Sequence, residues 1–169
     1  MALKKIDLKE LSFNPFLKIR DQWALLAAGK EDDWNAMTVN WGGLGELWYK
    51  EVTTVYVRPG RYTHKFMEEN DFYTLIFLKD GNREALNIYG SKSGRDIDKM
   101  SGCGLTPIVA DGCPTFAEAE LTLVCRKLYK GQIEPEGFLY QETIDRCYPQ
   151  RDFHTMYVGE VVAAYVNED

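Results

Sequence analysis

The stretch VTTVYVRPGRYTH, residues 52–64, combines a strand, a sharp turn and the start of a helix, and it decides the class of fold. Residues 52–57 are all β-branched or aromatic, which favours a strand. Pro59 and Gly60 then end that strand in a turn. Helix-forming residues follow at 64–70, with Thr63 as the predicted N-cap. The stretch therefore predicts a short strand that leads through a tight turn into a short helix.

Similar strand patterns occur on both sides of this stretch. Residues 23–28 and 35–41 flank the polar turn 29–33, and this arrangement predicts a hairpin. Residues 72–78 predict another strand, which ends at the turn 79–82.

Two strands are predicted in the second half of the chain. In residues 119–125 the apolar side chains recur with a period of two, which is typical of a half-buried strand. Residues 156–166 predict the last and longest strand. Gly159 inside it indicates either a bulge or a close approach of another part of the chain.

Helix signals are few and short. Asn14 followed by Pro15 predicts an N-cap and first turn of a helix that ends near Gln22. Residues 95–100 and 141–147 predict two more short helices. The predicted strands outnumber the predicted helices, and the two do not alternate regularly. This pattern indicates a mainly β, antiparallel barrel or sandwich. Since no linker or repeat interrupts the sequence, residues 1–169 are expected to form a single domain.

The chain is acidic, with 20 Lys and Arg against 26 Asp and Glu and a formal net charge of -6. A nucleic-acid-binding surface normally carries excess positive charge, so a nucleic-acid partner is not expected. The longest apolar runs have the length of strands, and no membrane-spanning helix is expected. The N-terminal residues lack the apolar region of a secretory signal, which predicts a cytoplasmic protein.

The four cysteines, Cys103, Cys113, Cys125 and Cys147, form no CxxC pair, and the chain has only two histidines. No metal site is therefore expected, and the thiols are expected to be reduced. Cys103 is the candidate for a reactive thiol because it lies in the glycine-rich sequence SGCG (101–104), near a predicted binding loop.

The turn at 57–64 is the first candidate binding site. A helix N-terminus favours an anion, and the predicted helix begins in this turn. Arg58 and Arg61 flank the start of that helix with side chains that bind phosphate oxygens well. Thr63 adds a hydroxyl group. The alternative is a surface turn whose two arginines pair with nearby acidic residues. The sequence contains neither a G-x-G-x-x-G motif after its first strand nor a P-loop, so a nucleotide would not bind by those devices.

A second candidate is GSKSGRDIDK, residues 90–99, in which serines, glycines and basic residues precede the predicted helix. Such a loop indicates either another anion site or an ordinary solvated loop. The third is WNAMTVNWGG, residues 34–43, which predicts either a strand that lies against a planar ring or an edge strand with two core tryptophans. His154, before the last strand, is a candidate hydrogen-bond donor in its neutral or protonated form, or else a buried polar residue.

Four motifs stand in series along the chain: NAMTVNWGG (35–43), VYVRPGRYT (55–63), GSKSGRDIDK (90–99) and HTMYVGEV (154–161). In this order they resemble the flavin reductase-like, FMN-binding split-barrel proteins, and among these the flavoredoxin-type branch. The resemblance covers nearly the whole chain. It implies a Greek-key split β-barrel of the FMN-binding type with a few short helices, which forms a homodimer and binds FMN non-covalently near the subunit interface.

The resemblance also implies roles for particular residues. His154 would lie near the flavin and the nicotinamide as the catalytic residue. The residues that would contact the ring are Asn35, Ala36, Met37, Thr38 and Trp41. Those that would hold the phosphate and the FMN tail are Arg58, Arg61, Tyr62, Thr63, Ser91, Ser93, Gly94, Arg95 and Lys99. Gly60 departs from the family, which often has a bulkier residue there.

Two functions follow from this resemblance, and a third is weaker. The first is an NAD(P)H-dependent flavin reductase, in which NADH or NADPH transfers hydride to FMN. The second is a flavoredoxin-like FMN electron carrier that a redox partner protein reduces. The third is a split-barrel relative that has lost flavin or uses haem or a deazaflavin. The retained arginines and threonine argue against this third function.

Overall fold

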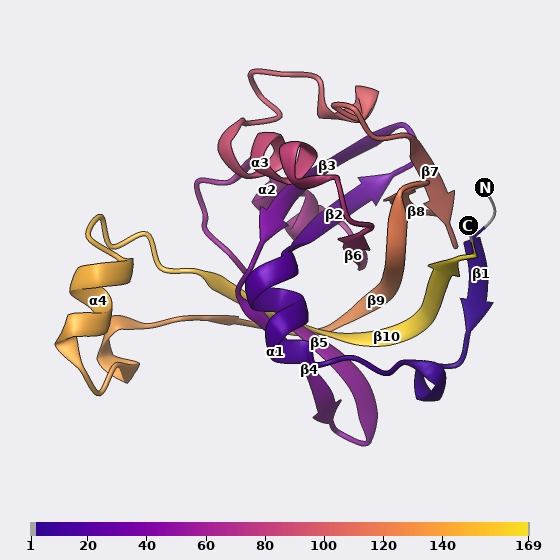
Figure 1. Cartoon of the computed structure of the whole chain (residues 1–169). Helices are drawn as coiled ribbons and strands as arrows, with labels where there is room; N and C mark the ends of the chain where they lie inside the picture. The colour runs from indigo at the N-terminus through magenta and orange to yellow at the C-terminus, as the bar shows by residue number, and fades with distance from the viewer. Residues whose placement is uncertain (1–2, 169) are drawn as a thin grey trace.

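An antiparallel sheet curls around an apolar core and forms the body of the protein (Figure 1). The structure is a computed structural model, and it describes residues 3–168. In this part of the chain eight strands form one sheet in the order β3-β2-β6-β9-β10-β5-β4, with β1 paired to β10. The strands are β1 (Leu3–Ile6), β2 (Ala24–Lys30), β3 (Asp33–Val39), β4 (Gly42–Leu47), β5 (Lys50–Val57), β6 (Phe72–Leu78), β7 (Pro107–Ala110), β8 (Cys113–Phe116), β9 (Ala119–Gln132) and β10 (Thr155–Asn167).

The helices are short, as the sequence predicts. The α-helices are α1 (Pro15–Leu17), α2 (Tyr62–Glu69), α3 (Arg83–Ser91) and α4 (Gln141–Cys147). Single turns of other types are η1 (Leu8–Glu10), η2 (Lys18–Gln22), η3 (Lys99–Ser101) and η4 (Pro135–Gly137). None of the helices in residues 3–168 is long and apolar enough to cross a membrane.

Most of the predicted elements are present. All strand pairs are antiparallel, and β2 and β3 form the predicted hairpin. The Asn14 side chain accepts hydrogen bonds from the first turn of α1, and Pro15 is its first residue. Helix α4 has the predicted bounds.

The predicted half-buried strand at 119–125 is instead buried on both faces from Leu121 to Cys125, whereas Glu120 is exposed. Leu121, Leu123 and Cys125 of β9 belong to the main core inside the sheet. On the other face Thr122 and Val124 lie under the β7–β8 hairpin, and the hydroxyl oxygens of Thr122 and Thr115 are 2.7 Å apart. The period of two was misleading because a second layer covers the outer face of this strand.

Two helix predictions are wrong in detail. Helix α2 begins at Tyr62 with Arg61 in the N-cap position, so Thr63 is not the N-cap. The Thr63 side chain is fully buried, and its hydroxyl oxygen accepts a hydrogen bond from Asn35 Nδ2 at 2.8 Å. The helix predicted at 95–100 is a turn followed by η3, which the Asp98 carboxylate caps and Gly102 ends at a φ of 94°.

Helix α3 was not predicted, and it changes the setting of the second candidate loop. Ala85, Leu86 and Tyr89 bury one face of α3 against the sheet. Ser91 is therefore the last residue of α3, and residues 92–95 lie between that helix and η3. Helices α2 and α3 pack on opposite faces of β2 and β3, and hydrogen bonds from the Arg61 guanidinium to the carbonyl oxygens of Tyr89 and Gly90 hold the start of α2 near the end of α3.

The bulge predicted at Gly159 is present, and so is the close approach. The register between β10 and β9 shifts between Val158 and Gly159. A Cβ atom on Gly159 would lie 2.3 Å from the hydroxyl oxygen of Tyr73, which is fully buried. Glycine is required here because the Tyr73 side chain crosses directly over this backbone position.

Beyond the sheet, the chain between β9 and β10 forms a projection, residues 133–153, here termed the arm (Figure 1). The arm contains α4 and has an apolar cluster of its own. Its buried members are Ile144, Tyr148 and Phe153, with Ile133, Phe138 and Cys147 packed around them.

Candidate functional site

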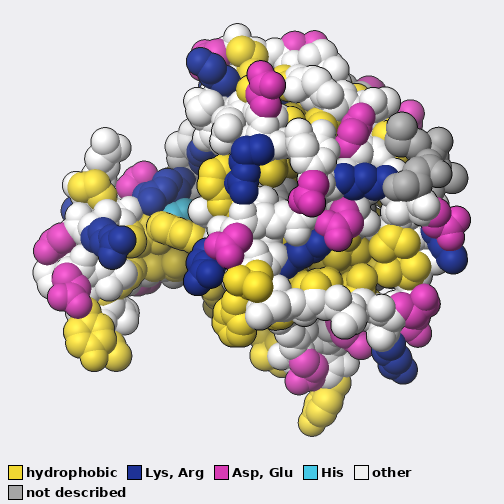
Figure 2. Space-filling view, in the orientation of Figure 1, with side chains coloured by type: hydrophobic (Ala, Val, Ile, Leu, Met, Phe, Trp, Pro, Cys, Tyr) yellow, Lys and Arg dark blue, Asp and Glu magenta, His cyan; other side chains and the backbone are white. Residues whose placement is uncertain are grey.

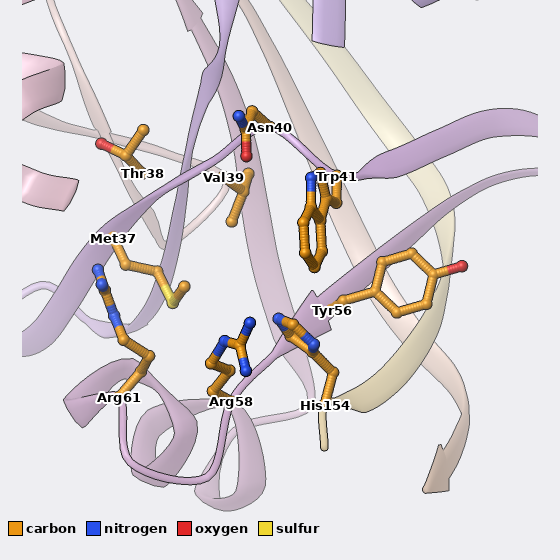
Figure 3. A pocket seen from close by; sticks show the side chains of 9 residues that line it. All are labelled: Met37, Thr38, Val39, Asn40, Trp41, Tyr56, Arg58, Arg61 and His154. Atoms are coloured by element: carbon orange, nitrogen blue, oxygen red, sulfur yellow. The ribbon is translucent and has the colours of Figure 1, made fainter. Parts of the chain in front are cut away.

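Two neighbouring cavities share the side chain of Arg61. The smaller one, termed the loop pocket, has a volume of about 80 Å³ and lies between the start of α2 and residues 91–94; it is lined by Asn35, Gly60, Arg61, Tyr62, Thr63, Ser91, Lys92, Ser93, Gly94 and Lys99. The larger one, termed the strand pocket, has a volume of about 210 Å³ and is lined by Met37, Thr38, Val39, Asn40, Trp41, Tyr56, Arg58, Arg61 and His154 (Figure 3). Most of the predicted site residues therefore gather around one continuous region.

Lys99, which is buried, and Arg61, which is half-buried, form a pair of cations beside the loop pocket. Lys99 is only 3% exposed, and its Nζ donates to the carbonyl oxygens of Ala36 at 3.0 Å and Tyr89 at 3.1 Å. The Arg61 guanidinium donates to the carbonyl oxygens of Gly90 at 2.9 Å and Tyr89 at 3.1 Å. Neither cation forms an ion pair with a carboxylate of the described residues.

This arrangement favours the binding of an anion. Burial, and next the charge of Arg61, lower the pKa of Lys99 to about 8. Burial also lowers the pKa of the Arg61 guanidinium. Two desolvated positive charges without an acidic partner are unfavourable, and a bound anion relieves that cost. The first residues of α2 line the same pocket and add the positive end of a helix dipole.

The loop at 91–95 is fastened to the start of α2. Arg95 donates to the carbonyl oxygen of Gly60 at 3.2 Å, and its guanidinium lies 4.8 Å from the ring centre of Tyr62. The hydroxyl oxygen of Ser93 accepts a hydrogen bond from the Arg95 backbone N–H at 3.2 Å. Ser91 donates back to the carbonyl oxygen of Asn87 within α3. The two predicted anion loops therefore form a single pocket.

Gly94 allows this close packing, and its replacement gives a test of the pocket. In Gly94→Ala the new Cβ atom would lie 2.2 Å from Asn35 Oδ1 and 2.9 Å from Tyr62 Cδ1. We expect the loop to move away from α2 and anion binding to weaken by about 1 kcal/mol, or roughly fivefold. Titration with inorganic phosphate and with FMN measures the effect, and Gly137→Ala, which lies in the arm outside both pockets and meets no atom within 4 Å, is the control. Unchanged affinity in Gly94→Ala would show that the loop does not contribute to binding.

The sequence predicts Arg58 as a phosphate ligand together with Arg61. In the structure Arg58 does not line the loop pocket, because its guanidinium has other partners. Its guanidinium pairs with Asp152 Oδ1 at 2.9 Å and donates to the carbonyl oxygen of Cys147 at 2.9 Å. It also lies 4.9 Å from the ring centre of Tyr148. The structure therefore shows the alternative predicted for Arg58, which is pairing with an acidic residue. Arg58 therefore ties the arm to the sheet at the edge of the strand pocket.

His154 is a buried, neutral side chain on the wall of the strand pocket. Its ring centre lies 5.4 Å from that of Trp41 and 6.3 Å from that of Tyr56. Burial, and next the charge of Arg58, lower the pKa of His154 to about 4. The imidazole is therefore neutral near pH 7, so the protonated donor considered from the sequence does not apply there.

Strand β3 supplies the opposite wall of the strand pocket. It stands at the end of the strand order, so one edge of its backbone has no strand partner. Met37 lines the pocket, the Thr38 hydroxyl donates to the carbonyl oxygen of Leu86, and Ala36 accepts from Lys99. Trp34 is a core residue, whereas Trp41 is 47% exposed, so only one of the two tryptophans belongs to the core.

Sequence reasoning missed five lining residues and two supporting ones. Val39, Asn40 and Tyr56 line the strand pocket, and Gly60 and Lys92 line the loop pocket. Tyr148 and Asp152 hold the rim of the strand pocket from the arm. A signal for Tyr56 was available, because it lies in β5 two positions before Arg58, and alternate residues of an extended chain point to the same side. No such signal exists for the arm residues, whose position depends on how the arm folds back.

Cys103, the candidate reactive thiol, lies in a setting that does not favour a thiolate, because burial raises the pKa of its thiol. All four cysteines are free. Within residues 3–168 no cluster of three or more His, Cys, Asp or Glu side chains is arranged to hold a metal ion.

The sequence model of the flavin reductase like domain matches residues 18–169. The chain belongs to the flavin reductase-like family. The match includes every residue of both pockets. No match to the chain was found among curated protein sequences.

Solved structures share the family fold. Those similar to the chain include an FMN-binding protein from Thermus thermophilus (21% identity, TM-score 0.69), a flavoredoxin from Methanosarcina acetivorans (22%, 0.67) and the styrene monooxygenase flavin reductase from Pseudomonas putida S12 (19%, 0.64). The similarities cover 86%, 98% and 87% of this chain and 70%, 76% and 80% of the other chains, respectively. At these identities the similarity shows the fold, and the predicted flavin reductase-like β fold with a few short helices is confirmed.

Proposed function

We propose that the chain binds FMN non-covalently and that NADH or NADPH reduces the bound flavin, so that the protein acts as a flavin reductase. The observation that carries the proposal is the cation pair of the half-buried Arg61 and the buried Lys99, which has no acidic partner in the described residues and borders a cavity with aromatic walls. Membership in the flavin reductase-like family supports a flavin as the ligand. The FMN-binding protein from Thermus thermophilus, which has the same fold, supports FMN in particular.

The residues present fit this cofactor. Arg61, Lys99 and the start of α2 would hold the phosphate in the loop pocket, together with the hydroxyl groups of Ser91 and Ser93. The free edge of β3, with the Trp41 and His154 side chains, would face the ring in the strand pocket. When bound, FMN supplies reversible two-electron chemistry with the nicotinamide as hydride donor.

The chain's own contribution is position, charge and exclusion of water. The cation pair fixes one end of the ligand, and the shared Arg61 side chain connects that end to the strand pocket. The neutral His154 ring offers a hydrogen bond near the cavity without adding a charge.

An absorbance spectrum of the purified protein, followed by anaerobic stopped-flow mixing with each nicotinamide, tests the proposal. We expect flavin absorbance that heat or acid releases as unmodified FMN, and rapid bleaching by NADH, NADPH or both. A protein that neither carries nor binds FMN would contradict the cofactor assignment. Bound FMN that neither nicotinamide bleaches would contradict the reductase assignment alone.

A flavoredoxin-like electron carrier is the second candidate. The fold similarity to the flavoredoxin from Methanosarcina acetivorans covers 98% of the chain, against 87% for the styrene monooxygenase flavin reductase. A carrier would hold FMN in the same pockets and receive electrons from a redox partner protein. Reduction of bound FMN by a low-potential electron-transfer protein, without reduction by nicotinamides, would favour this candidate.

We also propose that the protein forms a homodimer. Large apolar side chains are exposed at the β4–β5 turn and at the end of the arm, where Tyr49 is 99% and Leu139 is 90% exposed. Figure 2 shows such side chains on the arm and below the barrel. Light scattering during size-exclusion chromatography tests this proposal, and a monomer at micromolar concentration would contradict it.

The lowered pKa of Lys99 predicts how FMN affinity changes with pH. Raising the pH through about 8 removes the Lys99 charge from the free protein, while the FMN phosphate remains a dianion. We expect the FMN dissociation constant to rise between about pH 7.5 and pH 10, measured by fluorescence titration. Lys99→Arg should flatten this dependence because it keeps its charge. An equal pH dependence in both proteins would rule out Lys99 as the cause.

A further inference from the structure

The arm reaches the strand pocket through one hydrogen bond to its histidine. Tyr148 follows α4, and its hydroxyl oxygen lies 2.7 Å from Nδ1 of His154. Both side chains are buried, at 5% and 7% exposure. Every side-chain nitrogen or oxygen shielded from solvent in residues 3–168 has a hydrogen-bond partner, and Nε2 of His154 has none among these residues. Nε2 is therefore the ring atom open to solvent.

We propose that Tyr148 is the positioning residue for His154: its O–H donates to Nδ1, which places the ring proton on Nε2 and presents an Nε2–H donor to the strand pocket. The inference rests on the proposed function, since the donor has a purpose only if a ligand occupies that pocket. A phenol O–H is a stronger acid than a neutral imidazole N–H, so the tyrosine is the donor in this pair. The hydrogen bond from Tyr148 to Nδ1 thus determines that the ring proton is on Nε2.

Arg58 holds Tyr148 in place. The guanidinium lies 4.9 Å from the Tyr148 ring centre and donates to the carbonyl oxygen of Cys147, the last residue of α4. A carbonyl at a helix C-terminus lacks an intrahelical partner, so this bond secures the end of α4 at the pocket. Asp152 anchors the same guanidinium at 2.9 Å. Arg58 therefore acts through Tyr148, and not as a phosphate ligand.

Among the groups that face His154, Asp152 favours the protonated imidazole. The others favour the neutral imidazole or have no effect on its protonation. Arg58 opposes a charge on the ring, Asp152 favours one to a smaller extent, and burial opposes it most. Trp41 and Tyr56 contribute uncharged aromatic surface. A hydrogen bond from Tyr148 to Nδ1 adds to the preference for the neutral ring, because protonated Nδ1 cannot accept it.

Tyr148→Phe is the direct test. Phenylalanine keeps the ring contact to Phe153, whose centre is 4.7 Å away, and removes only the hydroxyl. The measurement is 15N NMR of the histidine rings in the purified protein as a function of pH. The chain has two histidines, and the spectrum of His64→Gln assigns them. Tyr140→Phe, on the exposed part of the arm, is the matched control.

We expect the Nε2–H tautomer of His154 in the natural protein and in Tyr140→Phe. In Tyr148→Phe we expect a mixture of both tautomers and a titration midpoint higher by about half a pH unit or more. The rate constant for flavin reduction should fall about tenfold, with the FMN dissociation constant unchanged within about twofold. Arg58→Lys, which keeps the charge but not the planar fork, should give an intermediate tautomer ratio.

An Nδ1–H tautomer in the natural protein, or the same ratio and midpoint in Tyr148→Phe, would overturn the inference. If Tyr148→Phe does not fold, the tautomer in the natural protein and the ratio in Arg58→Lys decide the question. Absence of FMN binding would contradict the proposed function instead, and the NMR result would still report on the Tyr148–His154 bond.

Discussion

Replacing Arg61 with alanine is expected to weaken FMN binding by about 1.5–3 kcal/mol, or roughly ten- to 150-fold, the range of a charge-assisted hydrogen bond. Among the described residues Arg61 is the one that lines both pockets, and with Lys99 it forms the cation pair. Its loss removes positive charge from the loop pocket and leaves Lys99 as the remaining buried cation there. Fluorescence titration of the ligand-free protein gives the dissociation constants.

Riboflavin, which lacks the phosphate, is the matched ligand for this prediction. Its affinity should change less than threefold in Arg61→Ala, since the charge of Arg61 is assigned to the phosphate. Arg95→Ala, which removes an exposed guanidinium from the same loop, should change FMN affinity by a few-fold at most. Equal losses for FMN and riboflavin would mean that Arg61 acts by holding the end of α3, through the carbonyl groups of Tyr89 and Gly90.

Gly159→Ala is expected to lower the free energy of unfolding by about 3 kcal/mol, because it forces an extra carbon into a filled core. The new Cβ atom would lie 2.3 Å from the Tyr73 hydroxyl oxygen and 2.7 Å from its ring. Tyr73 cannot move aside easily, since it is fully buried and its hydroxyl is 2.6 Å from Thr53 Oγ1. Urea unfolding followed by circular dichroism measures the change.

Gly45→Ala in β4 serves as the control for the intrinsic effect of this substitution in a strand. A Cβ atom at this position would meet no atom within 4 Å, so the stability should change by less than about 0.5 kcal/mol. Combining Gly159→Ala with Tyr73→Phe removes the nearest clashing atom and should recover part of the loss. Similar stabilities of Gly159→Ala and Gly45→Ala would show that the close approach at Tyr73 is not a constraint.

Local sequence patterns predicted most strands and three of the four α-helices at least in part, because those elements follow from residue types close in sequence. Helix α3 was missed, since the sequence REALNIYGS carries a glycine and a β-branched residue near its end. Its apolar face is recognisable only when packed on β2 and β3. The double burial of β9 was missed for a similar reason: the β7–β8 hairpin that covers it is close in sequence but leaves no mark on the β9 pattern.

The candidate site was predicted as a region, but its division into two pockets was not. Arg61, Ser91, Gly94 and Lys99 do come together, as the four motifs implied. Arg58 stands only three positions before Arg61 and has an equally suitable side chain. Arg58 lines the strand pocket alone because it directly follows β5 and pairs with Asp152 of the arm, whereas Arg61, in the N-cap position of α2, lines both pockets. That difference depends on Asp152, which is 94 residues away from Arg58 in sequence.

The separate apolar cluster of the arm has a consequence for how relatives of this protein diverge. The arm buries its side chains within itself and joins the barrel through the β9–β10 ladder and Arg58. Insertions, deletions and substitutions between residues 133 and 147 should therefore leave the barrel core unaffected. Natural variation can accumulate in this segment while the barrel core and the loop pocket stay the same, and a transplanted arm is a practical starting point for altering the wall of the strand pocket by design.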